Sequence, residues 1–320
     1  MSASFNEGFS ARNKRICFSI AGESNNHFVS QIAMFNLALR QLPEPYSQAH
    51  IKAFLGVEDE HNYDQKWGDH LTNVEIISIK KRNYSSVYIP QALQRFCANY
   101  SDYDYVIMCD ADTLILGDLD EVLSSLSKQE PIAGVLAHLP PSNFSNPNNN
   151  WREISHKLCK KSINLRYKYT LIDYEEGQNT KSLRAPYYLN NGFIAFHAQS
   201  FSDFSAVYPN MRELVCELIN PPFFAGQIAL ALTINHLNWE GICLPMRYNF
   251  PNDSRAIKQH GSEANDVIVL HYLRENNYSR STLFSQENTF YQFLELNHTV
   301  PDRLVFDAIM KLTKGHYPFN

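Results

Sequence analysis

Short apolar runs separated by polar segments recur along the chain, and their spacing predicts an α/β fold. Between two of these runs, apolar residues recur every three or four positions, which is the pattern of an amphipathic helix; they are Phe28, Ile32, Phe35, Leu39 and Leu42. Strands that alternate with helices are typical of a mostly parallel sheet flanked by helices. The predicted strands cover residues 14–21, 51–57, 74–79, 105–109, 131–138, 187–197 and 266–272.

The clearest of these strands ends in two carboxylates. Tyr105–Cys109 is an apolar run that suits a buried parallel strand. Asp110 and Asp112 follow it, separated only by the small Ala111. Ligands of open α/β sheets bind beyond the carboxyl ends of the strands, and two such carboxylates can share a hard divalent cation that keeps positions open for phosphates. The pattern therefore predicts a metal site, although aspartate is also common in plain strand-to-loop turns.

Two segments lie outside this alternation. Residues 139–186 form an insertion, in which a loop rich in Pro, Asn and Ser precedes a predicted helix over Trp151–Lys168 with many Lys and Arg residues. That basic helix is either a solvated face or a flap that attracts an anionic ligand. Residues 282–320 are expected to form two outer helices. Without a linker or an internal repeat, residues 1–320 are expected to form a single domain.

Composition and charge narrow the partners and the compartment. The 320-residue chain has a net charge of −5 and a pI of about 6.2, which argues against nucleic acid or an anionic membrane as a partner. The amino terminus lacks the apolar core of a signal peptide, and no run is long enough to cross a membrane. Six cysteines without a C-x-x-C pair suggest free, buried thiols in a reducing compartment. We therefore expect a soluble cytoplasmic protein.

Four motifs follow one another along the chain. They are Asp110-Ala111-Asp112 with the residues that follow, Asn190-Asn191-Gly192-Phe193, Leu244-Pro245-Met246-Arg247-Tyr248-Asn249, and His271-Tyr272. Together they resemble the nucleotide-sugar glycosyltransferases with a GT-A fold, specifically family 8, which includes glycogenin and bacterial lipopolysaccharide galactosyl- and glucosyltransferases. The resemblance covers roughly residues 14–275 and implies a single Rossmann-like GT-A domain with a mostly parallel sheet.

The resemblance implies a hexosyltransferase that moves a hexose from a nucleoside-diphosphate sugar, with UDP as the expected nucleotide, to a glycan or another hydroxyl acceptor. Asp110, Asp112 and His271 would hold a divalent metal that offsets the charge of the leaving diphosphate. The nitrogen ligand favours Mn²⁺, with Mg²⁺ as the alternative.

The resemblance also assigns residues to the donor. Asn190 and Gln227 would be catalytic residues that line the donor-sugar pocket, and a capping or core role is the alternative for both. The residues expected to bind the nucleotide sugar are Ala21, Phe28, Arg95, Asp110, Ala111, Asp112, Asn191, Gly192 and Arg274.

Two departures from the family pattern leave the donor sugar and the stereochemical outcome open. The family has an Asp beside the glutamine, whereas Gly226 and Ile228 flank Gln227 here. The K-P-W that follows the family's histidine motif is also missing, and with it a lysine for the diphosphate. Arg274, Arg280 or the basic helix could substitute for that lysine.

Two other functions use the same residues. Asp110-Ala111-Asp112-Thr113 also matches the D-x-D-x-T nucleophile motif of haloacid-dehalogenase-like phosphatases, in which the first Asp is phosphorylated and the second is the acid/base. Those enzymes carry the motif on their first strand, whereas three predicted strands precede it here. The third possibility is a GT-A domain that binds a nucleotide sugar without turning it over, with which the missing motifs agree.

Overall fold

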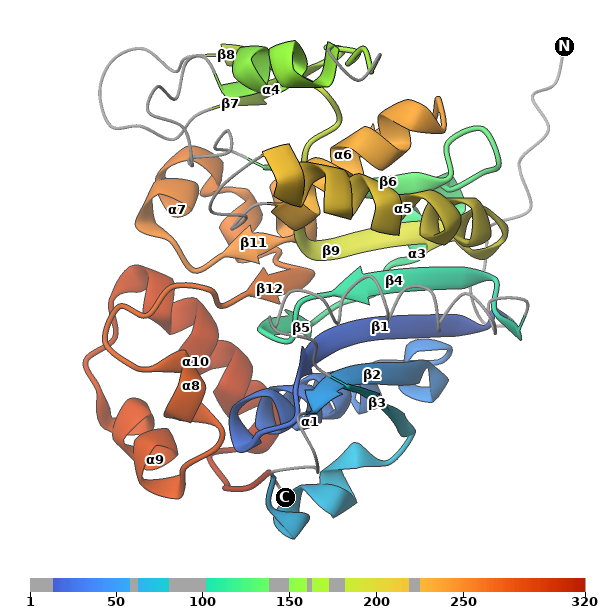
Figure 1. Ribbon diagram of the computed structural model, residues 1–320. Coiled ribbons are helices and arrows are strands. Elements are labelled where there is room, and N and C mark those ends of the chain that lie inside the picture. The colour runs from blue at the N-terminus through green and yellow to red at the C-terminus, as the bar shows by residue number, and fades with distance from the viewer. Residues whose placement is uncertain are drawn as a thin grey trace, which may run out of the picture.

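A seven-stranded, mostly parallel sheet with helices on both faces forms the centre of the molecule (Figure 1). The computed structural model describes residues 14–57, 63–80, 102–137, 150–159, 163–172, 182–218 and 225–319. In spatial order, the strands are β10 (Gly241–Cys243), β6 (Ile132–Leu136), β9 (Leu189–His197), β4 (Tyr105–Cys109), β1 (Ile16–Glu23), β2 (His50–Val57) and β3 (Val74–Lys80).

One strand runs against the others and brings two distant motifs together. β4, β1, β2 and β3 pair in parallel with one another, whereas β9 is antiparallel to both β4 and β6. The beginning of β9 therefore lies beside the end of β4, where Cys109 pairs with Phe193 and the Asp110 amide donates to the Gly192 carbonyl at 3.3 Å. This crossing places the Asn190-Asn191-Gly192 motif next to the two aspartates.

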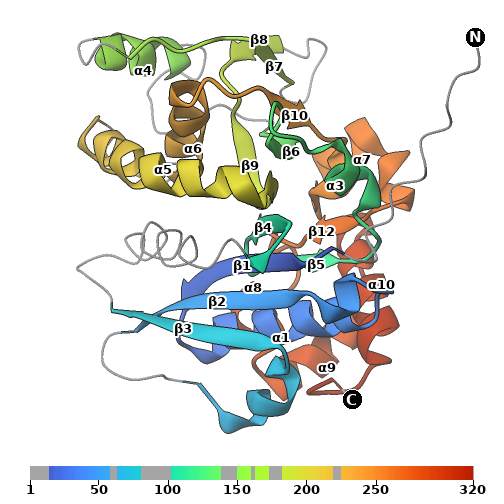
Figure 2. The ribbon, with the colours of Figure 1, turned by 90° about the vertical axis from the view of Figure 1, so that its right-hand side faces the viewer.

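The alternation of side chains along the strands builds one hydrophobic core on each face of the sheet. On β1, Ile16, Phe18 and Ile20 belong to the core that includes α1 (Asn26–Arg40), whereas Cys17 belongs to the other. That second core includes α5 (Ala198–Leu218) and α6 (Ala225–His236), which lie on the β9 side of the molecule in Figure 2. Successive strand residues point to opposite faces, so a strand buried on both faces is apolar throughout.

A second, three-stranded sheet lies at the end of β4. Its strands are β11 (Phe250–Pro251), β12 (Val269–His271) and β5 (Thr113–Ile115). β12 is antiparallel to β5, with His271 opposite Thr113. Figure 1 shows this sheet beside the C-terminal helices α8 (Arg280–Leu283), α9 (Glu287–Glu295) and α10 (Val300–Thr313). The other α-helices in the described part of the chain are α3 (Asp120–Ser125), α4 (Asn150–Cys159) and α7 (Ser254–His260).

The expected helix over 151–168 is wrong in its second half. α4 ends at Cys159, residues 163–168 have no regular structure, and β7 (Tyr169–Ile172) and β8 (Ser182–Ala185) form a hairpin after them. The Arg166 amide donates to Asn235 Oδ1 at 2.9 Å. The chain is therefore bound to α6 there, in place of an intrahelical hydrogen bond.

Four cysteines whose side chains are described are free, but only two of them are buried. Cys17 and Cys109 are buried in the strands, whereas Cys216 on α5 and Cys243 on the edge strand β10 are exposed. The expectation of burial was wrong for the latter pair because helix and sheet edges leave one side open. None of the described helices is long and apolar enough to cross a membrane.

Candidate metal and nucleotide-sugar site

Asp110 and Asp112 lie in the tight connection between β4 and β5, and three hydrogen bonds hold that connection. The Thr113 hydroxyl donates to the Asp110 carbonyl at 2.8 Å. The amide of Tyr272, the residue after β12, donates to the Asp112 carbonyl at 3.1 Å, and its hydroxyl donates to the Ala111 carbonyl at 3.3 Å. The backbone that carries both carboxylates is thus fixed from both sides.

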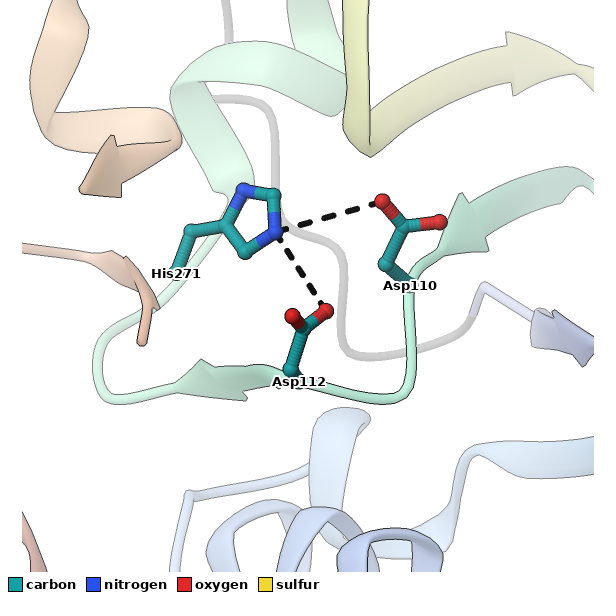
Figure 3. Close-up of side chains that lie close together, drawn as sticks. All are labelled: Asp110, Asp112 and His271. Carbon is teal, nitrogen blue, oxygen red and sulfur yellow. Dashed lines mark ion pairs between the residues drawn. The ribbon is translucent and has the colours of Figure 1, made fainter. Parts of the chain in front are cut away.

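The pairing of β12 with β5 brings His271 to the two carboxylates (Figure 3). His271 Nε2 is 3.3 Å from Asp112 Oδ1 and 3.9 Å from Asp110 Oδ2. One ligand atom from each residue lies within 4.8 Å of the other two. Two carboxylate oxygens and an imidazole nitrogen form a donor set that suits Mn²⁺ or Mg²⁺. The residues therefore fit the divalent metal that the sequence predicts.

A chain of amide groups orients the imidazole. His271 Nδ1 is 3.0 Å from Asn249 Oδ1, which can only accept, so that Nδ1 carries a proton and donates it. Asn249 Nδ2 in turn donates to Asn190 Oδ1 at 3.0 Å. This arrangement leaves Nε2 facing the carboxylates, as ligation of a metal requires.

The absence of a side chain at Gly192 makes room for this chain. A Cβ atom there would lie 2.4 Å from His271 Nδ1 and 2.5 Å from Asn249 Oδ1. Neither group could move away without breaking the hydrogen bond that orients the imidazole. Gly192 is thus required by packing behind the metal ligands.

The charged groups shift one another's pKa values. Burial and the neighbouring Asp112 raise the pKa of Asp110 to about 6. Burial would also raise the pKa of Asp112, but His271 and Arg280 outweigh it and lower that pKa to about 2. Burial lowers the pKa of His271, and the two carboxylates more than compensate, so its pKa is raised overall. Opposite charges thus favour ionised Asp112 and protonated His271 when no metal is bound.

A cavity of about 220 Å³ opens beside the two aspartates. Ala21, Phe28, Ala111 and Asn191, which the resemblance assigns to the nucleotide sugar, lie in its wall together with Asp110 and Asp112. The other residues of the wall were not predicted from the sequence, except for Arg280, which was considered as a substitute for the missing lysine. They are Ser19, His27, Gln31, Met108, Cys109, Tyr208, Leu230 and Arg280.

Other expected residues lie outside this wall. Asn190 and Gly192 lie behind His271, as described above. Gln227 is partly buried in the first turn of α6, and its neighbour Gly226 approaches the wall residues Asn191 and Tyr208. These three residues are therefore near the cavity without lining it.

The structure separates the two arginines that follow His271. Arg274 Nε donates to Asp253 Oδ2 at 2.8 Å, and Arg274 is not among the described residues that line the cavity. The structure therefore does not bring Arg274 to the expected nucleotide site, because Asp253 holds it elsewhere. Arg280, in contrast, lines the cavity and forms an ion pair with Asp112. Arg95 lies outside the described residues.

Two cations of the predicted basic helix, Arg166 and Lys168, are neutralised by Glu240, which follows α6. Lys168 Nζ forms an ion pair with Glu240, and Arg166 Nη1 is 3.8 Å from the same carboxylate. Arg166 also donates to the side chains of Asn235 and Asn238. These two cations thus fasten the insertion to the end of α6.

Similarity to known proteins is found among solved structures. No family model and no curated protein matches the sequence. Among solved structures, an active-site mutant of LgtC has a TM-score of 0.50 at 12% identity, covering 92% of this chain and 95% of that one. The galactosyltransferase LgtC in complex with donor and acceptor sugar analogs has a TM-score of 0.48 at 12% identity, with coverages of 91% and 95%. Mouse xyloside xylosyltransferase 1 has a TM-score of 0.46 at 10% identity, with coverages of 81% and 97%.

At such low identity, the similarity to the LgtC mutant concerns the fold. It extends over nearly the whole of both chains, and the observed mixed sheet with flanking helices matches the expected architecture. The chain shares the GT-A fold of the glycosyltransferase LgtC.

Proposed function

We propose that this protein is a metal-dependent glycosyltransferase that moves a hexose from a nucleoside-diphosphate sugar, with UDP as the nucleotide, to an acceptor hydroxyl. The observation that carries the proposal is the convergence of Asp110, Asp112 and His271 on one point at the edge of a cavity. That point lies at the carboxyl end of β4, where open α/β sheets bind ligands. The shared fold with LgtC agrees with it.

In this proposal, the protein groups divide the work between metal and donor. Asp110, Asp112 and His271 hold the divalent metal, which when bound supplies Lewis-acid stabilisation of the leaving diphosphate. Mn²⁺ is preferred because one ligand is an imidazole. Asn190 positions His271 through Asn249.

The cavity residues would bind the donor. Ala21 and Phe28 offer apolar contacts to the nucleoside, while Ala111 and Asn191 lie closer to the two aspartates. Gln227, at the start of α6 behind Asn191, is the proposed catalytic residue on the sugar side. Arg95 keeps its proposed role in binding the donor.

We further propose that residues 1–320 form a single GT-A-like domain in a cytoplasmic protein. The 139–186 insertion would then be the acceptor side, and residues 282–320 a helical extension. The acceptor would be a glycan or another molecule with a free hydroxyl.

The proposal is tested by thermal stabilisation with UDP, with and without Mn²⁺, in the wild type and in Asp112→Asn. A ligand that binds only the folded state at a hundredfold excess over its Kd adds about 2.7 kcal/mol to the free energy of unfolding. We expect UDP to stabilise the wild type only with Mn²⁺, and Asp112→Asn to lose that effect. Asp69→Asn, at an exposed aspartate of the Gln65–Leu71 segment, is the control that should keep it.

Two outcomes would favour the other functions. An absent UDP effect together with hydrolysis of an aryl phosphate would overturn the proposal in favour of the phosphatase motif. Metal-dependent UDP binding without release of UDP from any sugar nucleotide would identify a binding domain without turnover.

A further inference from the structure

Both oxygens of the Asp112 carboxylate face cationic or potentially cationic groups. Oδ1 faces His271 Nε2 at 3.3 Å, and Oδ2 forms an ion pair with Nη1 of Arg280. The side chain of Asp112 is only 13% exposed, so solvent screens these contacts weakly. A central ligand of the candidate metal site is thus neutralised by the protein's own arginine.

A metal and Arg280 must compete for this carboxylate. A divalent cation between Asp110, Asp112 and His271 would add two positive charges within a few ångströms of the guanidinium. The Asp112 carboxylate would then attract both the metal and the Arg280 guanidinium, and the metal would repel the guanidinium. Binding of the metal therefore weakens the hold of Asp112 on Arg280.

The released guanidinium has one suitable destination in the cavity. Arg280 is the only Arg or Lys in the cavity wall, as far as the chain is described. Its Nε is buried and has no hydrogen-bond partner among the described residues. An arginine edge with unused N–H groups suits the paired oxygens of a phosphate. An anionic ligand beside the metal would satisfy this donor.

The position of Arg280 in the chain allows it to change partners. It is the first residue of α8, which has only four residues and begins without a side-chain cap. Its side chain is 32% exposed and extends into an open cavity. A rotation of the long side chain therefore exchanges its partner without unfolding an element of the core.

We propose that Arg280 is shared between two partners: it neutralises Asp112 in the metal-free protein and turns to the anionic diphosphate of the donor once a divalent metal binds Asp112. The second part of this inference, in which Arg280 binds the diphosphate, rests on the proposed function. Arg280 would thereby couple metal binding to nucleotide binding, so that each ligand favours the other.

The test is a set of calorimetric titrations on the wild type, Arg280→Gln and Arg280→Lys. Mn²⁺ is titrated without nucleotide, and UDP and uridine are titrated at saturating Mn²⁺. We expect Arg280→Gln to bind Mn²⁺ about tenfold more tightly, because the competing cation is gone, and UDP about tenfold more weakly. Uridine affinity should not change. Arg280→Lys keeps the charge and should restore the wild-type Mn²⁺ affinity, while restoring UDP affinity only in part.

Arg303→Gln is the control, because it removes an exposed arginine of α10 that is not among the described residues lining the cavity. It should leave both affinities unchanged. A glutamine variant that binds both ligands more weakly would show a merely structural role and overturn the inference. An unchanged Mn²⁺ affinity in Arg280→Gln would overturn it as well.

The failure of the inference and the failure of the proposed function give different results. A wild type that binds Mn²⁺ but no UDP would refute the proposed function and the diphosphate half of the inference. The Mn²⁺ titration would still decide whether Arg280 competes for Asp112. A wild type that binds both ligands, with UDP affinity insensitive to Arg280, would leave the function standing and refute the inference.

Discussion

Asn249 determines which nitrogen of His271 faces the aspartates. Its Oδ1 accepts from Nδ1 at 3.0 Å, and its own amide is held by Asn190. The sequence places Asn249 in a motif that resembles the family, but nothing local indicates a contact with His271. Such a contact depends on how two segments meet in space, so the sequence and the family resemblance could name the candidate ligands but not the residue that orients His271.

Replacing this partner should weaken metal binding without touching a ligand. In Asn249→Ala, His271 Nδ1 loses its acceptor, and the imidazole is free to rotate or to change tautomer. Loss of such an orienting contact typically costs 10- to 100-fold in metal affinity. We expect a loss of about that size in the Kd for Mn²⁺, measured by calorimetry.

The control for this variant is Asn265→Ala, which removes an exposed asparagine. It should bind Mn²⁺ like the wild type. If Asn249→Ala folds and keeps the wild-type affinity, the amide chain does not orient the imidazole.

Among the elements, long buried strands were predictable and short pairings were not. β4 has the expected bounds because a continuous apolar run identifies a strand buried on both faces. β5 has only three residues, which are too few for a periodic pattern, so no strand was predicted there from the sequence. Yet its pairing with β12 is what brings His271 to Asp112. The third ligand could therefore be named only through the resemblance.

The crossing of β9 behind the ligands tolerates no side chain at residue 192. In Gly192→Ala, the new Cβ would overlap His271 Nδ1 and Asn249 Oδ1. Overpacking of this kind costs roughly 1–3 kcal/mol. We expect a lower melting temperature and an Mn²⁺ affinity reduced by about tenfold or more, because the imidazole must shift.

Gly68→Ala is the comparison, because a Cβ at that position meets nothing within 4 Å. It should change neither the melting temperature nor the metal affinity by much. Wild-type metal binding in Gly192→Ala would mean that β9 and the ligands are less tightly packed than described.

For the whole molecule, the sequence indicated the α/β architecture, but not which cation faces the cavity. Arg274 and Arg280 lie in one segment after His271, and their composition does not distinguish them. The fold decides, because Asp253 binds Arg274 while α8 directs Arg280 to Asp112. The extent of the helix over 151–168 was wrong for a similar reason, since the remote Asn235 of α6 binds the backbone at Arg166.

The charges of the site also link the stability of the whole protein to pH. The pKa of His271 is higher in the folded protein than in the unfolded chain. Protonation of His271 therefore stabilises the fold at pH values below the ordinary histidine pKa, and this contribution is lost as pH rises through the raised pKa. The pKa of Asp110 is raised to about 6, so stability also falls as pH rises towards 6. The reason is that Asp110 ionises at a lower pH in the unfolded chain than in the folded protein. Asp112 contributes stability above its ordinary pKa, which is lost only as pH falls towards about 2.

Metal should reverse this dependence between pH 6 and pH 8. Without metal, the site stabilises the protein less as pH rises, because His271 loses its proton. With metal, His271 must lose the same proton to become a ligand, so the stabilisation by Mn²⁺ should increase with pH.

We expect a larger rise in melting temperature on adding Mn²⁺ at pH 8 than at pH 6, measured by scanning calorimetry against a chelator blank. His271→Gln has no imidazole proton to displace and should show a smaller pH dependence of this rise, with the remainder due to Asp110, whose pKa of about 6 lies at the lower end of this range. An equal or larger effect of Mn²⁺ at pH 6 in the wild type would show that His271 is not a ligand.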